Sequence, residues 1–249
     1  MRSIVVSLSM AFVFCTLPEN NNIRIFLAGD STMSIKEVKA YPETGWGMPF
    51  ANFWDSSVTV VNRAKNGRST KTFITEGLWK SIMDDAGPGD YVFIQFGHND
   101  EAREKVERYT TPDEYRNNLV KFITETKNKK AIPVLLTPVT RRRFDTTGNI
   151  MQTHEEYSNL VRQVAKEHQT YFIDLDEKSR GLLQEFGKKD SKLLFLQLKP
   201  GEHPNYPEGK DDNTHFNELG ARLIAQLVLA EIKTTIPDLA ARIIKPKAK

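Results

Sequence analysis

The sequence has 249 residues, of which 39% are hydrophobic, and a formal net charge of +3. This length is enough for one α/β domain with a substantial buried core. Lysine and arginine are interspersed with acidic residues, which excludes the basic stripe of a nucleic-acid-binding protein. After the N-terminus, no segment has the roughly 20 consecutive apolar residues that a membrane-spanning helix needs. We therefore expect one domain over residues 21–249, a monomer without a nucleic-acid partner.

The first 20 residues have the layout of a secretory signal peptide. Arg2 lies near the start, an apolar run extends from Ile4 to Phe14, and a polar break follows at residues 18–20. This order is typical of a cleavable signal, although a first core strand or an ordinary helix would also fit a short apolar run. The predicted location is secreted or periplasmic, with no stable membrane insertion after cleavage.

Cys15 is the single cysteine of the chain. Attachment of a lipid at this residue is an alternative, but Phe12, Val13 and Phe14 are bulkier than a lipoprotein signal peptidase normally accepts. After cleavage the remaining domain has no cysteine, which excludes disulfides, a cysteine nucleophile and thiolate metal sites.

Short runs of β-branched and aromatic residues alternate with longer amphipathic segments, the pattern of repeated βα units around a parallel sheet. The predicted strands are residues 23–28, 58–62, 91–96, 132–137 and 171–173. The predicted helices are residues 112–128, 153–168 and 217–233, the first two with threonine N-caps at Thr111 and Thr153. Residues 179–210 contain Pro200, Pro204 and Pro207, so a loop or lid is expected there.

Polar segments follow three of the predicted strands. They are residues 29–33, 66–69 and 97–100. In an open parallel sheet, ligands bind where the chain leaves the carboxyl ends of the strands. We therefore expect these segments to meet at one edge of the sheet and to form the functional site.

Ser31 is the candidate nucleophile, in a turn that Gly29 allows to change direction sharply. A serine reacts only when a base takes its proton and when hydrogen-bond donors meet the anionic intermediate. The N–H groups of Ser31 and Gly67 and the side-chain amide of Asn99 can supply such donors. Taken singly, Ser31 could cap a helix, Gly67 could belong to a turn, and Gly97 could end a strand.

His215 is the candidate base, in a segment just before the last predicted helix. An aspartate three residues earlier, Asp212, can accept the Nδ1–H of that histidine and leave Nε2 facing the serine. Asp211 is a neighbouring alternative for this orienting role.

Four blocks of this sequence together resemble the SGNH, or GDSL-like, hydrolases. The blocks are residues 29–31, Gly67, residues 97–100 and residues 212–215, in the order that the family has. The resemblance covers about residues 23–232. It implies an α/β, three-layer flavodoxin-like domain with a five-stranded parallel sheet, and no metal or organic cofactor. It also implies that Ser31, His215 and Asp212 are the triad and that Ser31, Gly67 and Asn99 form the oxyanion hole.

Within this superfamily, the amino-acid sequence at residues 27–33, 45–47, 66–69 and 96–100 resembles that of rhamnogalacturonan acetylesterases. Thr32 follows the serine where many lipolytic members have leucine. The resemblance implies an esterase that removes acetyl groups from an acetylated pectic polysaccharide, with acetylxylan or another acetylated glycan as the alternative. This chain lacks the cysteines of fungal members, and residues 179–210 have no clear counterpart in them.

Four residues are candidate substrate contacts. Trp46 could form a platform for a sugar ring, whereas Trp54 fits core packing better. Galacturonate carboxylates would favour guanidinium groups, which Arg68 and Arg141 could supply, although a solvated charged loop also explains residues 141–143. His98 is expected to shape the site or to contact substrate.

The other histidines have separate expected roles, and two other functional classes are alternatives. His154 and His168 are expected to face solvent, and His203 is a candidate for substrate contact. A metal-dependent hydrolase would use His98, Asp100, Asp212 and His215 as ligands, with His203 as an additional candidate. A non-catalytic carbohydrate-binding domain would need none of the serine chemistry.

Overall fold

A computed structural model describes residues 22–245, so the predicted signal peptide and Cys15 lie outside the described residues. All five predicted strands are present as β1 (Ile23–Gly29), β2 (Val58–Asn62), β3 (Tyr91–Gln95), β4 (Ile132–Leu136) and β5 (Tyr171–Ile173). They form one parallel sheet in the order β2-β1-β3-β4-β5. The expected five-stranded α/β fold is therefore confirmed.

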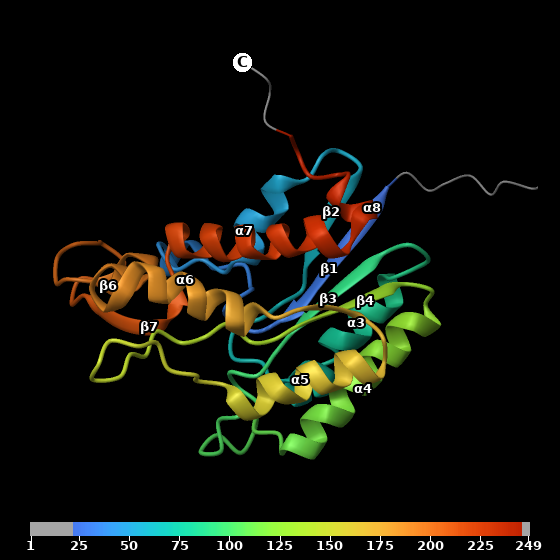
Figure 1. Ribbon diagram of the computed structural model, residues 1–249, viewed down its shortest axis with the longest axis horizontal. Helices are drawn as coiled ribbons and strands as arrows, with labels where there is room; N and C mark the ends of the chain where they lie inside the picture. The colour runs from blue at the N-terminus through green and yellow to red at the C-terminus, as the bar shows by residue number, and fades with distance from the viewer. Residues whose placement is uncertain (1–21, 246–249) are drawn as a thin grey trace, which may run out of the picture.

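Helices cover both faces of this sheet, which makes the architecture three-layered (Figure 1). On one face lie α1 (Gly47–Phe50), α6 (Leu175–Asp190) and α7 (Glu218–Thr235). On the other lie α2 (Thr70–Thr75), α3 (Leu78–Asp85), α4 (Pro112–Asn128) and α5 (Glu155–Glu167). The shorter elements are η1 (Val38–Ala40), η2 (Ala51–Phe53), η3 (Ser191–Leu194) and α8 (Pro237–Ala240).

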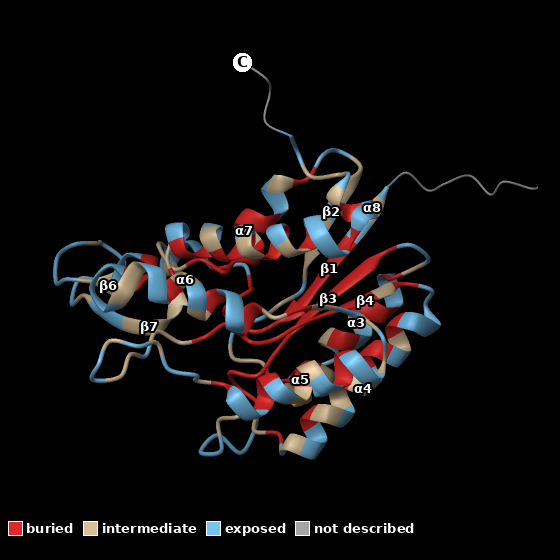
Figure 2. Cartoon of the chain, in the orientation of Figure 1, coloured by how far each residue is buried: buried red, intermediate tan, exposed pale blue. Residues whose placement is uncertain are grey.

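Alternating side chains of the strands supply the two hydrophobic cores. In β1, Ile25 and Leu27 pack under α7, whereas Phe26 and Ala28 pack toward α3 and α4. This is the period of two expected of a strand that is covered on both faces. The central strands are accordingly among the most buried parts of the chain (Figure 2).

The helix starts show which capping predictions hold. Thr111 and Glu114 form a reciprocal capping box at the start of α4, with Pro112 at its first turn. Helix α5 begins later than predicted, at Glu155, and Thr153 is not its cap. The Thr153 hydroxyl instead accepts the N–H of Arg141 at 2.9 Å, so this residue ties two loops together.

The expectation of a loop or lid over residues 179–210 is wrong for residues 179–198 and is confirmed for residues 199–209, which form turns. Helix α6 continues to Asp190, and after η3 the chain forms β6 (Phe195–Leu198), which pairs antiparallel with β7 (Lys210–Phe216). Leu183, Leu194 and Phe195 hold this region because each is at least 99% buried. The three prolines lie only in the turns between β6 and β7. Among the described residues, no helix is long and apolar enough to cross a membrane.

Strand β7 carries residues 212–215, and the segment after β4 holds it at the edge of the sheet. The N–H of Arg142 donates to the Asn213 carbonyl at 2.8 Å, and its Nη1 donates to the Asn213 side chain at 2.8 Å. Arg141 Nη1 donates to Thr214 Oγ1 at 2.7 Å. These contacts bring the C-terminal part of the chain to the loops that follow β1, β2 and β3.

Candidate active site

The turn after β1 presents Ser31 at the carboxyl edge of the sheet. The buried Asp30 carboxylate accepts the N–H of Thr32 at 2.9 Å and its hydroxyl at 2.8 Å, and Gln95 Nε2 donates to the same hydroxyl at 2.7 Å. Burial alone would raise the pKa of Asp30, but His98 and the Thr32 donors outweigh it and lower the pKa to about 2. An ionised carboxylate thus fixes the turn that carries Ser31.

Three side chains from the two ends of the chain form a continuous hydrogen-bonded row. His215 Nε2 lies 2.9 Å from Ser31 Oγ, and His215 Nδ1 lies 2.8 Å from Asp212 Oδ2. The other carboxylate oxygen of Asp212 accepts the N–H groups of Thr214 at 2.8 Å and His215 at 2.9 Å. Burial would raise the pKa of Asp212, but the His215 contact and these N–H groups hold the pKa well below its usual range.

The neighbouring carboxylate of Asp211 does not reach the histidine. Its Oδ1 accepts Gln197 Nε2 at 2.7 Å, and the residue is exposed. Because successive side chains of a strand point to opposite faces, Asp211 and Asp212 diverge. The alternative orienting residue is therefore not supported by the geometry.

Potential oxyanion donors line the same cleft as the Ser31 hydroxyl. Gly67 has a φ of 76°, a conformation that favours glycine. Asn99 Nδ2 donates to the Arg68 carbonyl at 2.9 Å, which orients the amide and leaves its second N–H available. Within residues 22–245, the N–H groups of Ser31 and Gly67 donate to no protein acceptor. Ser31, Gly67 and Asn99 all line one cleft of about 630 Å³, together with Asp212 and His215.

Comparison with known proteins agrees with this geometry. The family model described as "GDSL-like Lipase/Acylhydrolase family" matches residues 27–223. The chain belongs to this family. It is therefore a carboxylic-ester hydrolase, and the superfamily expected from the four sequence blocks is confirmed.

Several family members are similar over most of the chain. The rhamnogalacturonan acetylesterase RhgT of Bacillus subtilis is 42% identical over 211 residues, which are 85% of this chain and 90% of RhgT. The probable rhamnogalacturonan acetylesterase YesY of Bacillus subtilis is 36% identical, over 90% of this chain and 98% of YesY. The crystal structure of protein YxiM from Bacillus subtilis has a TM-score of 0.74 at 27% identity, with 86% of this chain matching 56% of the YxiM chain.

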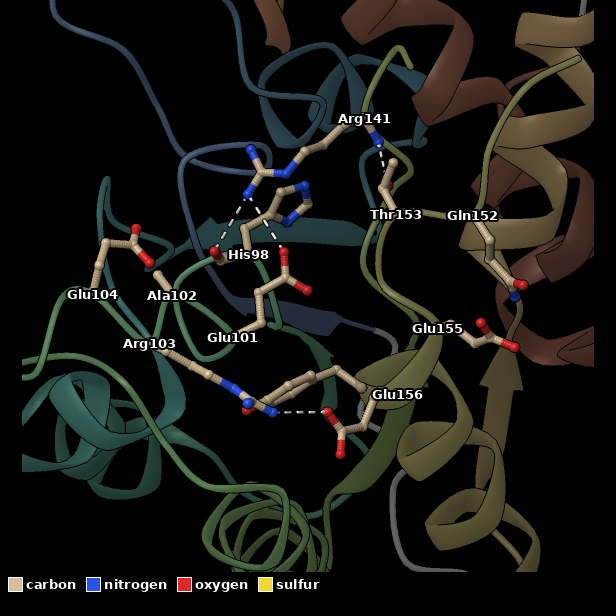
Figure 3. Close-up of a pocket in the computed structure, with 11 residues that line it drawn as sticks. His98, Glu101, Ala102, Arg103, Glu104, Arg141, Gln152, Thr153, Glu155 and Glu156 are labelled. Atoms are coloured by element: carbon tan, nitrogen blue, oxygen red, sulfur yellow. Dashed lines mark hydrogen bonds and ion pairs between the residues drawn. The ribbon is translucent and has the colours of Figure 1, made fainter. Parts of the chain in front are cut away.

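Among the predicted substrate contacts, Arg141 reaches the cleft that contains Ser31. It lines the Ser31 cleft and also a neighbouring cleft of about 440 Å³. Figure 3 shows its guanidinium directed at His98 and Glu101: Nη2 lies 3.4 Å from the His98 carbonyl and 3.6 Å from Glu101 Oε1. Arg108 lines the Ser31 cleft as well, beside Gly67, and the sequence analysis did not predict it.

Two of the predicted contacts do not reach the site. Trp46 is 0% exposed and donates its indole N–H to Gln95 Oε1 at 2.7 Å, so it is a core residue and not a sugar platform. The Arg68 guanidinium is paired with Glu76 at 2.9 Å and does not line the Ser31 cleft. Trp54 is buried against Phe50, in agreement with its expected core role.

His98 and His154 form a buried pair beside the site. Their ring centroids lie 4.3 Å apart, His98 Nδ1 is 3.3 Å from Asp30 Oδ2, and His154 Nδ1 is 2.9 Å from Glu101 Oε1. Burial, followed by the neighbouring His154, lowers the pKa of His98 to about 4. The expectation that His154 faces solvent is wrong, since the residue is 1% exposed. His98 occupies the site wall as a neutral ring.

The residues of the alternative metal site do not converge. Asp100 Oδ1 accepts hydrogen bonds from Thr70 and Thr110, while His203 packs against Tyr41 in the turns between β6 and β7. Over residues 22–245, no group of three or more His, Cys, Asp or Glu side chains has the spacing of a metal site. His203 does not line the Ser31 cleft, and His168 is half-buried at the end of α5.

Removal of the Asn99 amide should affect the reaction more than the affinity for substrate. We expect Asn99→Ala to lower kcat by on the order of 10²-fold, as loss of a single oxyanion donor does, with a small change in KM. Steady-state kinetics on an aryl acetate would measure both. Asn118→Ala, outside the cleft on α4, is a matched control; equal losses in the two variants would contradict the assigned role of Asn99.

Proposed function

We propose that this family member is a serine acetylesterase that removes O-acetyl groups from a pectic polysaccharide, with rhamnogalacturonan as the substrate. The observation that carries the proposal is the row from Asp212 through His215 to Ser31, with spacings of 2.8 and 2.9 Å. The names of RhgT and YesY, the two relatives above, support the choice of substrate.

The reaction proceeds by acyl transfer in two steps. Because the Asp212 carboxylate can only accept, Nδ1 of His215 carries the proton and Nε2 accepts one from Ser31. Ser31 Oγ attacks the acetyl carbonyl carbon, and the sugar oxygen leaves with the proton that His215 holds. Water then attacks the acetyl-Ser31 ester with His215 as base, acetate departs, and Ser31 regains its proton.

The developing oxyanion would be bound by the N–H groups of Ser31 and Gly67 and by the Asn99 amide. Donors that are already oriented stabilise charge in the transition state without further reorganisation. The turn of Asp30 and the bond from Asn99 to the Arg68 carbonyl supply that orientation.

Cationic groups in the cleft could bind a uronate carboxylate. Lys105, Arg108 and Arg141 line the cleft, together with the acidic residues Glu43, Glu104 and Asp212; Arg108 contacts Gly67 and Arg141 contacts Thr214. A galacturonate residue that carries the acetyl ester also carries a carboxylate, which a guanidinium can bind with two hydrogen bonds.

The substrate is tested by comparing polymers with and without carboxylates. We expect Arg141→Ala to raise KM for acetylated rhamnogalacturonan about 10-fold or more, the value of a charge-assisted hydrogen bond, while KM for acetylxylan changes little. Acetate release would be measured for both polymers and for an aryl acetate. Arg143→Ala is the matched control, because Arg143 is exposed and lines neither cleft. Equal KM changes on both polymers, or faster release from xylan by the unaltered enzyme, would contradict the pectic assignment.

We also propose that the enzyme is secreted or periplasmic. The support is the run from Ile4 to Phe14 after Arg2 and the polar break that follows it. An acetylesterase for a cell-wall polymer must act where the polymer is. N-terminal sequencing of the protein recovered outside the cytoplasm would test the cleavage.

A further inference from the structure

Lys36 is a buried cation beside the candidate active site that the acyl-transfer steps above do not use. Its side chain is 2% exposed, although lysine is almost never fully buried without partners. Three acceptors surround its ammonium: the Ser31 carbonyl at 2.5 Å, Asn66 Oδ1 at 2.7 Å and Glu43 Oε1 at 2.8 Å. Three acceptors match the three donors of an ammonium group.

These three acceptors belong to different parts of the site. Ser31 is in the turn after β1, and its own N–H is a proposed oxyanion donor. Asn66 directly precedes Gly67, whose N–H is the second proposed donor. Ser34 Oγ also donates to Asn66 Oδ1, at 2.6 Å. The Lys36 ammonium therefore joins the two loops whose N–H groups must point at one oxygen.

Glu43 is the acidic partner of Lys36, with its Oε1 2.8 Å from the ammonium. Burial lowers the pKa of Lys36, and the hydrogen bond and charge of Glu43 oppose that shift. The Glu43 side chain is itself 16% exposed and lines the Ser31 cleft. A buried ion pair of this kind is costly to desolvate, so its presence here needs a reason other than stability.

We infer that Lys36 is a positioning residue that sets the relative placement of the Ser31 and Gly67 N–H groups in the oxyanion hole. The inference rests on the proposed function. Since a misplacement of about 1 Å can cost 10²-fold in rate, loss of this link should act on the transition state and leave binding of substrate nearly unchanged.

The test uses variants that separate positioning from stability. Lys36→Met removes the link but leaves Glu43 unpaired, whereas the double variant Lys36→Met with Glu43→Gln removes both charges. Asn66→Ala cuts the link to the Gly67 loop and retains the pair of Lys36 with Glu43. Lys178→Met is the matched control, because Lys178 pairs with Glu231 on the α6 and α7 side of the molecule.

Each variant would be assayed on an aryl acetate for kcat and KM, and by titration with a boronic acid, whose adduct with serine resembles the tetrahedral oxyanion. We expect the double variant and Asn66→Ala to lower kcat about 10- to 100-fold, to weaken boronate binding by a similar factor, and to change KM little. Thermal unfolding of the double variant should be close to that of the unaltered enzyme, and Lys178→Met should retain full kcat.

The outcomes are distinguishable. Unaltered kcat in the double variant and in Asn66→Ala, or a lowered kcat with unaltered boronate affinity, would overturn the positioning role. If the lysine variants do not fold, Asn66→Ala decides alone. Full turnover of Ser31→Ala would instead overturn the proposed function, because the boronate adduct and the oxyanion hole both presuppose that nucleophile.

Discussion

Replacement of Ser31 by alanine is expected to lower kcat on acetylated rhamnogalacturonan by on the order of 10⁶-fold, the loss seen when a triad serine is removed. The hydroxyl 2.9 Å from His215 Nε2 is the atom that would carry the acetyl group. Without it, only the oxyanion donors and substrate binding contribute to the rate. KM should change little, because the acetyl group and the sugar still bind in the same cleft.

The measurement combines acetate release with labelling by a serine-directed phosphonate. The unaltered enzyme should be labelled once per chain and inactivated in parallel, and Ser31→Ala should take up no label. Ser81→Ala, in α3 on the opposite side of the sheet from α7, is the control and should behave as the unaltered enzyme. Near-normal turnover of Ser31→Ala, or inactivation by EDTA without phosphonate labelling, would refute the serine mechanism.

The sequence was informative about the sheet and about the loops that follow it, for a local reason. Each strand is a short apolar run, and the candidate residues stand directly after the first three. Parallel strands bring such positions to one edge whatever the intervening helices do. The proximity of Ser31 and His215 could therefore be anticipated from topology, although the two residues are far apart along the chain.

Predictions from the sequence were wrong where contacts between residues distant in the chain decide the local structure. Trp46 stands between two glycines, a pattern that favours an open position. In the structure, these glycines allow close backbone approach: a Cβ at Gly45 would lie 2.1 Å from the Ser34 carbonyl oxygen, and one at Gly47 would lie 2.5 Å from that of Met33. The lack of side chains is thus what buries Trp46, since glycine permits tight packing as well as flexible turns.

In the region before β7, glycine and proline mark only local interruptions, whereas the sequence pattern predicted an irregular segment throughout. Gly187 interrupts α6 with a φ of 69°, and the prolines are confined to the turns between β6 and β7. Strand β6 pairs with β7, and Lys36 contacts residues of other loops. These contacts join segments that lie apart in the chain, so a single sequence does not reveal them. His154 was misplaced for the same reason, because the start of α5 packs against the loop after β3.

A graded loss is expected along the row of Asp212, His215 and Ser31. His215→Ala should lower kcat by on the order of 10⁶-fold, and Asp212→Ala by on the order of 10⁴-fold. In the proposed mechanism, the histidine moves the proton in both steps, so no other group replaces it. The aspartate only holds the ring and its tautomer, and part of that orientation remains when it is lost.

The structure indicates why the loss for Asp212 should still be large. Its two oxygens accept Nδ1 of His215 and the N–H groups of Thr214 and His215, so one carboxylate fixes both the ring and the backbone of β7. Asp212→Asn would keep the size of the side chain but would present an amide N–H where an acceptor is needed, and should be no more active than Asp212→Ala. Asp211→Ala is the matched control, because its carboxylate contacts Gln197 and not the histidine. The pre-steady-state rate of acetyl-enzyme formation on an aryl acetate would measure the gradation, and a larger loss for Asp211→Ala than for Asp212→Ala would reverse the assignment of the orienting carboxylate.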